Sequence, residues 1–199
     1  MKVKIKKEGK VKEFKLINSW ADVTLESWLK LIDFETGTKT EEATQTIVEL
    51  SNIPKKLVNE LALSDVAVIM SKIGELQSKQ DTKLKRIIEI NDIEYGFHPD
   101  LDSITLGEYA DIEQFIKNGI ETNLPELMAV LYRPIKEKKN DIYIIDAYDG
   151  DIRMRTEEMK QMSAQQVQSA LVFFYNFAKI LSEILPLYLM EKLKETKTQ

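Results

Sequence analysis

A series of helix-start signals, each followed by apolar residues at helical spacing, constrains the fold of this chain most. Thr24 and Thr40 each precede such a stripe, and Pro54 occupies a position that a first helical turn tolerates. Thr105-Leu-Gly-Glu108 and Ser163-Ala-Gln-Gln166 both fit the capping-box pattern, in which two side chains satisfy the free N–H groups of a helix start. The chain is therefore predicted to form a bundle of short, separately capped helices.

Between the helices, alternating β-branched and aromatic residues predict short β-hairpins. One is expected over residues 1–17, with a turn at Glu8-Gly9, and a second over residues 86–98, around Asn91-Asp92. A third is expected over residues 142–155, after a polar loop. The fold class predicted is thus α+β, mainly α: a helical bundle with two or three short hairpins. The predicted organisation is a basic hairpin at 1–17, packed on or extending from a mainly helical body at 18–199.

The last helix is predicted to be the longest, at about Ala164–Lys194, with a kink at Pro186. At about 1.5 Å per residue it would span roughly 45 Å, which is longer than a small domain is wide. Phe173 and Tyr188 fall outside its inward stripe and are candidate interface residues. Burial within the chain and contact with a partner are both open for them.

The N-terminal hairpin is strongly basic. Its first 15 residues hold seven lysines against two glutamates, which leaves a net charge of −10 on the rest of a chain whose total is −5. Such a surface suits an acidic partner, a phosphate, or an acidic neighbour in an oligomer. Lysines on an exposed edge strand also prevent unwanted sheet pairing. Nucleic-acid binding is only weakly indicated, because no aromatic residue or arginine is interleaved with the lysines. The lysines considered as interface residues are Lys2, Lys4, Lys6, Lys7, Lys10 and Lys12.

The sequence offers little catalytic chemistry. It has no cysteine and one histidine, His98, and it lacks a glycine-rich phosphate loop and the common hydrolase motifs. Asp146, Asp149 and Asp151 are the densest carboxylates, but Gly150 has the wrong offset for a calcium loop, and an Asp-Gly turn is favoured. We therefore predict no catalytic residue, no cofactor, no metal site and no enzyme activity.

No membrane association is expected. The start of the chain alternates charged with apolar residues, unlike a signal peptide. The apolar stretch Ala170–Met190 is interrupted by Asn176, Lys179 and Glu183, so it is interpreted as a buried helix. A cysteine-free chain fits a reducing cytoplasm, or a virus assembled in one.

Two stretches together carry a family resemblance: Ile104-Thr-Leu-Gly-Glu-Tyr-Ala-Asp-Ile112 and Leu127-Met-Ala-Val-Leu-Tyr-Arg-Pro134. The first hairpin followed by Val23-Thr-Leu-Glu-Ser-Trp28 adds to it. The chain resembles small structural and assembly proteins encoded beside the capsid, neck and tail genes of tailed bacteriophages. The resemblance implies a virion structural protein of the head–tail or tail region, or one packaged in the particle, assembled in the host cytoplasm. Its partners would be other phage structural proteins, in a homo-oligomer or a large complex.

Three alternatives stay open. A tail-assembly chaperone would bind another phage protein and be absent from the finished virion. A carboxylate-dependent hydrolase would need two acidic residues in one cleft with raised pKa values. A DNA-contacting protein would bind through the hairpin lysines, with steep dependence on salt.

Overall fold

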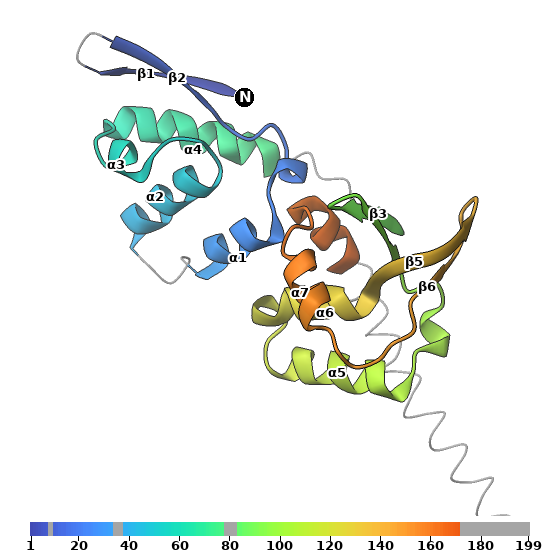
Figure 1. The fold of residues 1–199 in the computed structure, drawn as a ribbon. Helices are drawn as coiled ribbons and strands as arrows, with labels where there is room; N and C mark the ends of the chain where they lie inside the picture. Colours follow the sequence, from blue (N-terminus) through green and yellow to red (C-terminus); the bar gives the residue numbers. More distant parts are fainter. Residues whose placement is uncertain (8–9, 34–37, 78–82, 172–199) are drawn as a thin grey trace, which may run out of the picture.

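The computed structural model describes residues 1–7, 10–33, 38–77 and 83–171. Over these residues the fold is α+β and mainly helical, with a two-stranded and a four-stranded antiparallel sheet, so the predicted fold class is confirmed. The chain forms two lobes, each with its own hydrophobic core, and the two small sheets lie in different lobes (Figure 1). The body expected at 18–199 thus contains two cores.

The first lobe opens with the expected hairpin. Strand β1 (Lys2–Lys7) pairs antiparallel with β2 (Lys10–Lys15). Side chains alternate between the two faces of a strand, so Val3 and Ile5 share one face, and both are buried against the first core. The hairpin therefore packs on the helices through this apolar face.

Short helices make up the rest of the first lobe. Helix α2 begins two residues earlier than predicted, because its cap is Thr38 and not Thr40. Thr38 and Glu41 form a capping box in which each side chain bonds the backbone N–H of the other residue. The helical elements are η1 (Trp20–Asp22), α1 (Leu25–Asp33), α2 (Lys39–Glu49), α3 (Lys55–Val58) and α4 (Leu63–Gln77).

The second lobe surrounds helix α6 (Leu124–Leu131), in which every residue except Glu126 is buried. A helix that is apolar on all sides requires cover on all sides. The sheet in the order β3-β4-β5-β6 supplies part of that cover, and helices supply the rest. The other elements are β3 (Ile87–Ile90), β4 (Ile93–Phe97), η3 (Leu101–Ser103), α5 (Leu106–Lys117), η4 (Glu121–Asn123), β5 (Tyr132–Lys139), β6 (Ile142–Ile145) and α7 (Arg153–Met159).

The third hairpin was predicted at the wrong place. The expected second strand, in residues 152–155, is the start of helix α7. The partner of β6 is instead β5, whose charged residues were interpreted as a polar loop. Asn140, at a φ of 58°, and Asp141 form the two-residue turn between them. The hairpin over 86–98 is confirmed, as β3 and β4 with Asn91 and Asp92 at positive φ.

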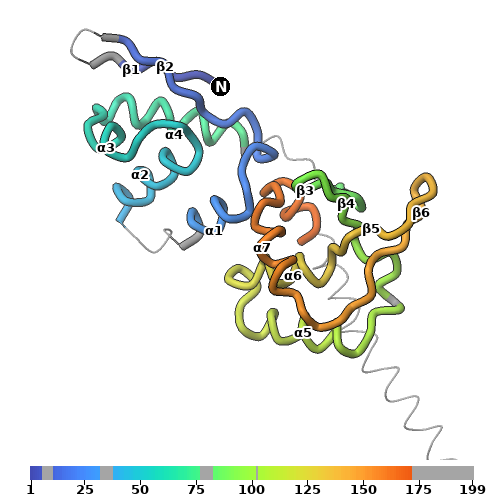
Figure 2. Tube along the Cα trace, in the orientation of Figure 1, coloured from blue at the N-terminus to red at the C-terminus, as the bar shows by residue number. Residues whose placement is uncertain are grey.

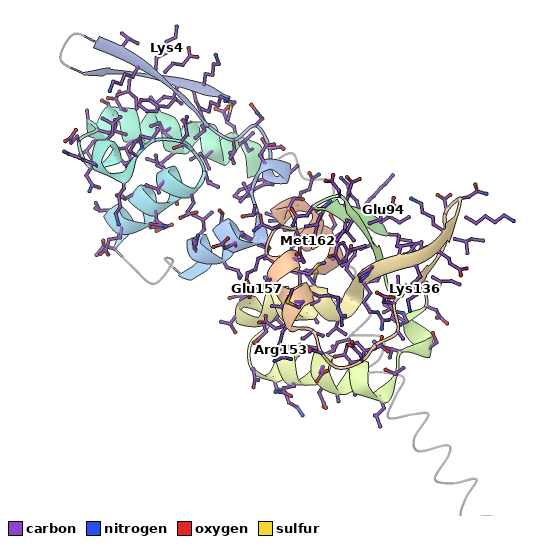
Figure 3. The ribbon with its side chains drawn as sticks, viewed as in Figure 1. Lys4, Glu94, Lys136, Arg153, Glu157 and Met162 are labelled. Atoms are coloured by element: carbon purple, nitrogen blue, oxygen red, sulfur yellow. The ribbon has the colours of Figure 1, made fainter. Side chains whose placement is uncertain are left out.

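Two segments cross between the lobes and hold them together. The Leu25 N–H donates to the Met162 carbonyl and the Ala164 N–H to the Val23 carbonyl, both at 2.7 Å. The Leu25 side chain belongs to the second core, whereas Ala164 belongs to the first, and Trp28 packs against both. Figure 2 shows the two segments side by side, and Met162 is labelled at this crossing in Figure 3. Each lobe thus depends on a residue from the other end of the chain.

The predicted start of the last helix is confirmed. Ser163 and Gln166 each bond the backbone N–H of the other, as a capping box requires, and residues 164–171 are helical. The remainder of the predicted helix to Lys194, with Pro186, lies outside the described residues.

Candidate interaction surfaces

The N-terminal hairpin does not place all of its lysines on one face. Directly opposite residues of an antiparallel pair share a face. Lys2 pairs with Lys15 and Lys4 with Glu13, on the face opposite Val3. Lys12 pairs with Ile5, which makes it a continuation of the apolar face. The lysines of the basic hairpin are therefore divided between its two faces.

The exposed face of the hairpin also carries a negative charge. Lys2 and Glu13 form an ion pair, and Lys4 points away from the helices (Figure 3). The hydrogen bond that Lys2 donates to the Glu13 carboxylate lowers the pKa of Glu13 and raises the pKa of Lys2, so both groups stay charged at neutral pH. This alternation of signs is less suited to a phosphate backbone than an unbroken basic strip.

The other predicted interface residues are described only in part. The backbones of Lys6 and Lys7 pair with those of Val11 and Lys10, but the side chains of Lys6, Lys7 and Lys10 lie outside the described structure. Phe173 and Tyr188 lie in the C-terminal part of the chain that is not described.

A surface that the sequence did not indicate is the arm formed by β5 and β6. The pairing of β4 with β5 ends at Pro134, so residues 135–145 continue as a two-stranded hairpin that projects from the second lobe (Figure 1). On this arm Ile142 is 79% exposed and Ile144 57% exposed. Among the strands that the structure describes, β6 is the last in its sheet and has one edge without a partner strand. An exposed apolar edge strand of this kind is a site for pairing with another chain.

The β6 side of the arm is fixed to the lobe by Tyr143. Its hydroxyl donates to the Phe97 carbonyl at 2.7 Å and to the Arg86 carbonyl at 3.2 Å, and its side chain is buried. The ring lies against Gly96, where a Cβ atom would collide with it. Glycine at position 96 is thus what allows β6 to approach β4 so closely.

Two exposed ion pairs flank the arm. Lys136 lies 3.0 Å from Asp146, and Lys138 pairs with Glu94 at 2.5 Å. Lys136 and Glu94 are labelled in Figure 3, near the base of the arm. Exposed pairs contribute only about 0–1 kcal/mol each, so the buried Tyr143 is the stronger anchor.

The β5 side of the arm is fixed by a buried charge cluster at the start of helix α5. The Glu108 carboxylate lies 2.7 Å from the Arg133 guanidinium, and Arg133 is the second residue of β5. Glu108 also accepts from the Thr105 N–H and hydroxyl, at 2.7 and 2.6 Å, as part of the predicted capping box. His98 completes the cluster, with Nε2 3.5 Å from the same carboxylate.

The electrostatics of this cluster keep Glu108 ionised and His98 neutral. Burial alone would raise the pKa of Glu108, but the Thr105 hydrogen bonds and the Arg133 charge outweigh it and lower the pKa below 4.5. Burial lowers the pKa of His98 below 6.5 despite the neighbouring carboxylate. Because His98 Nδ1 accepts from the Asp100 N–H at 3.3 Å, Nε2 carries the proton and faces Glu108.

Arg133 also contacts an aromatic ring. Its guanidinium carbon lies 5.8 Å from the centre of the Tyr148 ring, and the Tyr148 hydroxyl donates to Asp111 on α5. Burial raises the pKa of Tyr148 well above its ordinary value, so the hydroxyl stays protonated. The whole cluster therefore fastens the loop after β6 and the root of β5 to one helix.

The predicted turn at Asp146, Asp149 and Asp151 is observed. The Asp151 N–H donates to Asp149, and the Asp151 carboxylate accepts three hydrogen bonds from Arg153, two from its guanidinium at 2.9 and 2.8 Å and one from its backbone N–H at 3.3 Å. These bonds lower the pKa of Asp151 to about 2. In the described ranges, no group of three or more histidine or acidic side chains is placed to hold a metal ion.

The arm was missed for an identifiable reason. The sequence Lys136-Glu-Lys-Lys-Asn140 has neither the β-branched residues nor the alternation that predicts a strand. The available signal was Asn140-Asp141, a pair that tolerates positive φ and lies directly before the first residue of the hairpin expected over 142–155.

Within the described part of the chain, no helix is both long enough and apolar enough to span a membrane. Comparison with protein-family models, with curated proteins and with solved structures finds no match for this chain.

Proposed function

We propose that this protein is a structural component of a tailed-bacteriophage particle, acting through protein–protein assembly in the head–tail or tail region or inside the particle. The observation that carries the proposal is the projecting β5–β6 arm, with Ile142 and Ile144 exposed on a strand that has no partner on one edge within the described part of the chain. Two large apolar side chains on a fixed projection are costly in water unless they are covered in an assembly.

The way the arm is held supports the same role. A mobile loop would lose conformational entropy on binding, whereas this arm is fixed through Tyr143 on one strand and Arg133 on the other. The motifs that resemble phage structural proteins also contribute to this anchorage. Glu108 lies in the first resembling stretch and Arg133 in the second, and the two pair with each other.

The buried cluster does not favour an enzymatic function. A general acid at neutral pH requires a carboxyl group with a raised pKa, whereas the pKa of Glu108 is lowered by its partners. Among the described carboxyl groups with a shifted pKa, each shift is downward.

The test is quantitative mass spectrometry of purified phage particles that carry the gene. A structural component is expected at a fixed copy number relative to the major capsid protein, after washing in high salt. Absence from particles, together with co-purification with a tail protein from infected cells, would overturn the proposal in favour of a tail-assembly chaperone.

A further inference from the structure

The partner of the arm is identified by the chemistry of strand β6. We propose that β6 pairs edge to edge with β6 of a second copy of this chain, antiparallel and about a two-fold axis at Tyr143. This inference rests on the proposed function only in treating the arm as an assembly surface. It adds the identity of the partner, the register of the contact and the symmetry of the product.

The first argument is the absence of charge on β6. Proteins commonly protect exposed edge strands with charged side chains, lysine above all. Strand β1 follows that rule, with Lys2 and Lys4 exposed. Strand β6 reads Ile-Tyr-Ile-Ile and carries no charge at all. When such a strand pairs with its own copy, no like charges on the two strands come face to face.

The second argument is the pattern on β5, beside β6. Ile142 pairs with Lys139, and Ile144 pairs with Glu137. On the same face of the arm, Ile142 therefore lies beside a positive charge and Ile144 beside a negative charge. In antiparallel pairing centred on Tyr143, Ile142 faces Ile144 of the second copy. The β5 and β6 strands of the two copies then form a four-stranded sheet. Each line of paired residues across this sheet has Lys139 of one copy at one end and Glu137 of the other copy at the other end. The four isoleucines become contiguous, and the flanking charges are complementary.

The third argument is the availability of the main-chain groups. In an antiparallel ladder, a residue directs its N–H and C=O groups together to one side of the strand, and the next residue directs them to the other. Lys139 and Ile142 close the two-residue turn, so the main-chain groups of Ile142 and Ile144 face β5. Those of Tyr143 and Ile145 face the open edge, which provides the hydrogen-bonding groups at the two-fold centre.

The contact is small, because β6 has only four residues. Interfaces of limited area are transient, so a dimer that depends on protein concentration is expected and not a permanent one. Sedimentation velocity on the full chain, over a range of concentrations, should show exchange between monomer and dimer.

Two matched lysine variants test the surface. Ile144→Lys places two ammonium groups close to the two-fold axis and is expected to abolish the dimer. Val68→Lys, at a site of similar exposure on α4, is expected to leave it unchanged. Circular dichroism checks that both variants are folded. A wild-type chain that is monomeric at every concentration, or a dimer that survives Ile144→Lys, would overturn the inference.

Oxidative cross-linking tests the register, since the natural chain has no cysteine. In the proposed pairing, the Cβ atoms of positions 142 and 144 from different copies lie about 4.5–5.5 Å apart, near what a disulfide requires, whereas identical positions lie about 7 Å apart or more. A mixture of the Ile142→Cys and Ile144→Cys proteins should therefore cross-link faster than either protein alone. Equal rates in all three samples would contradict this register.

Other outcomes distinguish two-fold pairing from head-to-tail pairing, and the proposed function from the β6 dimer. A closed ring of more than two copies would mean head-to-tail pairing and would overturn the two-fold contact. A cross-linked dimer in solution with no copies in purified particles would refute the proposed function and support this inference. A fixed copy number in particles together with a strictly monomeric purified chain would support the proposed function and refute the β6 dimer.

Discussion

The carboxylate of Glu108 lies 2.7 Å from the guanidinium of Arg133, and both side chains are almost completely buried, at 1% and 5% exposure. The pair joins the first turn of α5 to the root of the β5–β6 arm. Two charges removed from water in this way depend on each other, because within the described residues the only other group close to the Glu108 carboxylate that could carry a positive charge is His98, which is neutral.

Glu108→Gln is expected to destabilise the protein by about 3–5 kcal/mol, because it leaves Arg133 charged and buried without a countercharge. Glutamine still fits the capping box, so the loss measures the charge and not the helix cap. Urea denaturation followed by circular dichroism gives the free energy of unfolding. The matched control is Glu113→Gln on the same helix, which breaks an exposed pair with Lys117 and should cost about 0.5 kcal/mol or less. Similar losses in the two variants would refute the buried pair.

Stability is expected to fall as the pH decreases below about 6.5, because the pKa of His98 is lower in the folded chain than its ordinary value. Below this pH the unfolded chain binds a proton at His98 that the folded chain does not bind. The stabilisation that comes from this difference is therefore fully present above about pH 6.5, and it is lost as the pH falls through the pKa of His98 in the folded chain. Glu108 adds a second loss of stability below about pH 4.5, because its pKa is also lower in the folded chain than its ordinary value.

The measurement is urea denaturation at about pH 7.5 and about pH 5.5, for the wild type and His98→Gln. His98 is the only histidine, so the variant should show a flatter dependence over this range. An unchanged slope would contradict a lowered pKa, and a proton NMR titration of the single imidazole gives an independent value.

Gly96→Ala and Gly74→Ala should change stability in opposite directions. An alanine Cβ at position 96 would collide with the Tyr143 ring and lie 2.8 Å from Ile145, which forces β6 away at a cost of about 1–3 kcal/mol. At position 74, inside α4, nothing lies within 4 Å, and the same change should stabilise the helix by about 0.5–1 kcal/mol. Thermal unfolding of both variants checks the signs, and a stabilising effect at position 96 would refute the close packing of Tyr143 on β4.

The two lobes are expected to unfold in one transition, because Leu25 is buried in the second core and Ala164 in the first. Leu25→Ala, at a site with 0% exposure, should cost about 2–5 kcal/mol and lower the stability of both lobes together. Leu63→Ala, at 87% exposure, should change stability by about 0.5 kcal/mol or less. Tryptophan fluorescence and circular dichroism should give coincident curves. Two separate transitions in the wild type would show that the lobes are independent.

Local signals in the sequence were sufficient where a residue acts on its own neighbours. The caps at Thr105 and Ser163 and the turn at Asn91-Asp92 each depend on residues within a few positions, and all three were predicted correctly. The cap of α2 was predicted at Thr40 although Thr38 has the glutamate three residues later that a capping box needs. The capping-box pattern for α2 is therefore present in the sequence at Thr38 and Glu41.

Contacts between distant residues account for what the sequence could not predict. Strand β5 forms because Tyr132 and Arg133 are held by the core and by Glu108, although four of the six residues that follow are charged. Helix α7 has no side-chain cap at Ile152 and is stabilised by packing on α6. His98 and Glu108 are ten positions apart and meet only when α5 folds back on β4. Of the candidate surfaces, the lysine hairpin was predicted and the apolar arm was not.

The exchange of Leu25 and Ala164 between the cores also limits how this chain can vary in evolution. A gene fragment that encoded the second lobe alone would lack Leu25, and one that encoded the first lobe alone would lack Ala164. Recombination between related genes at a point between the lobes would therefore combine mismatched halves of both cores. Neither lobe is a portable module, and the two must be inherited together.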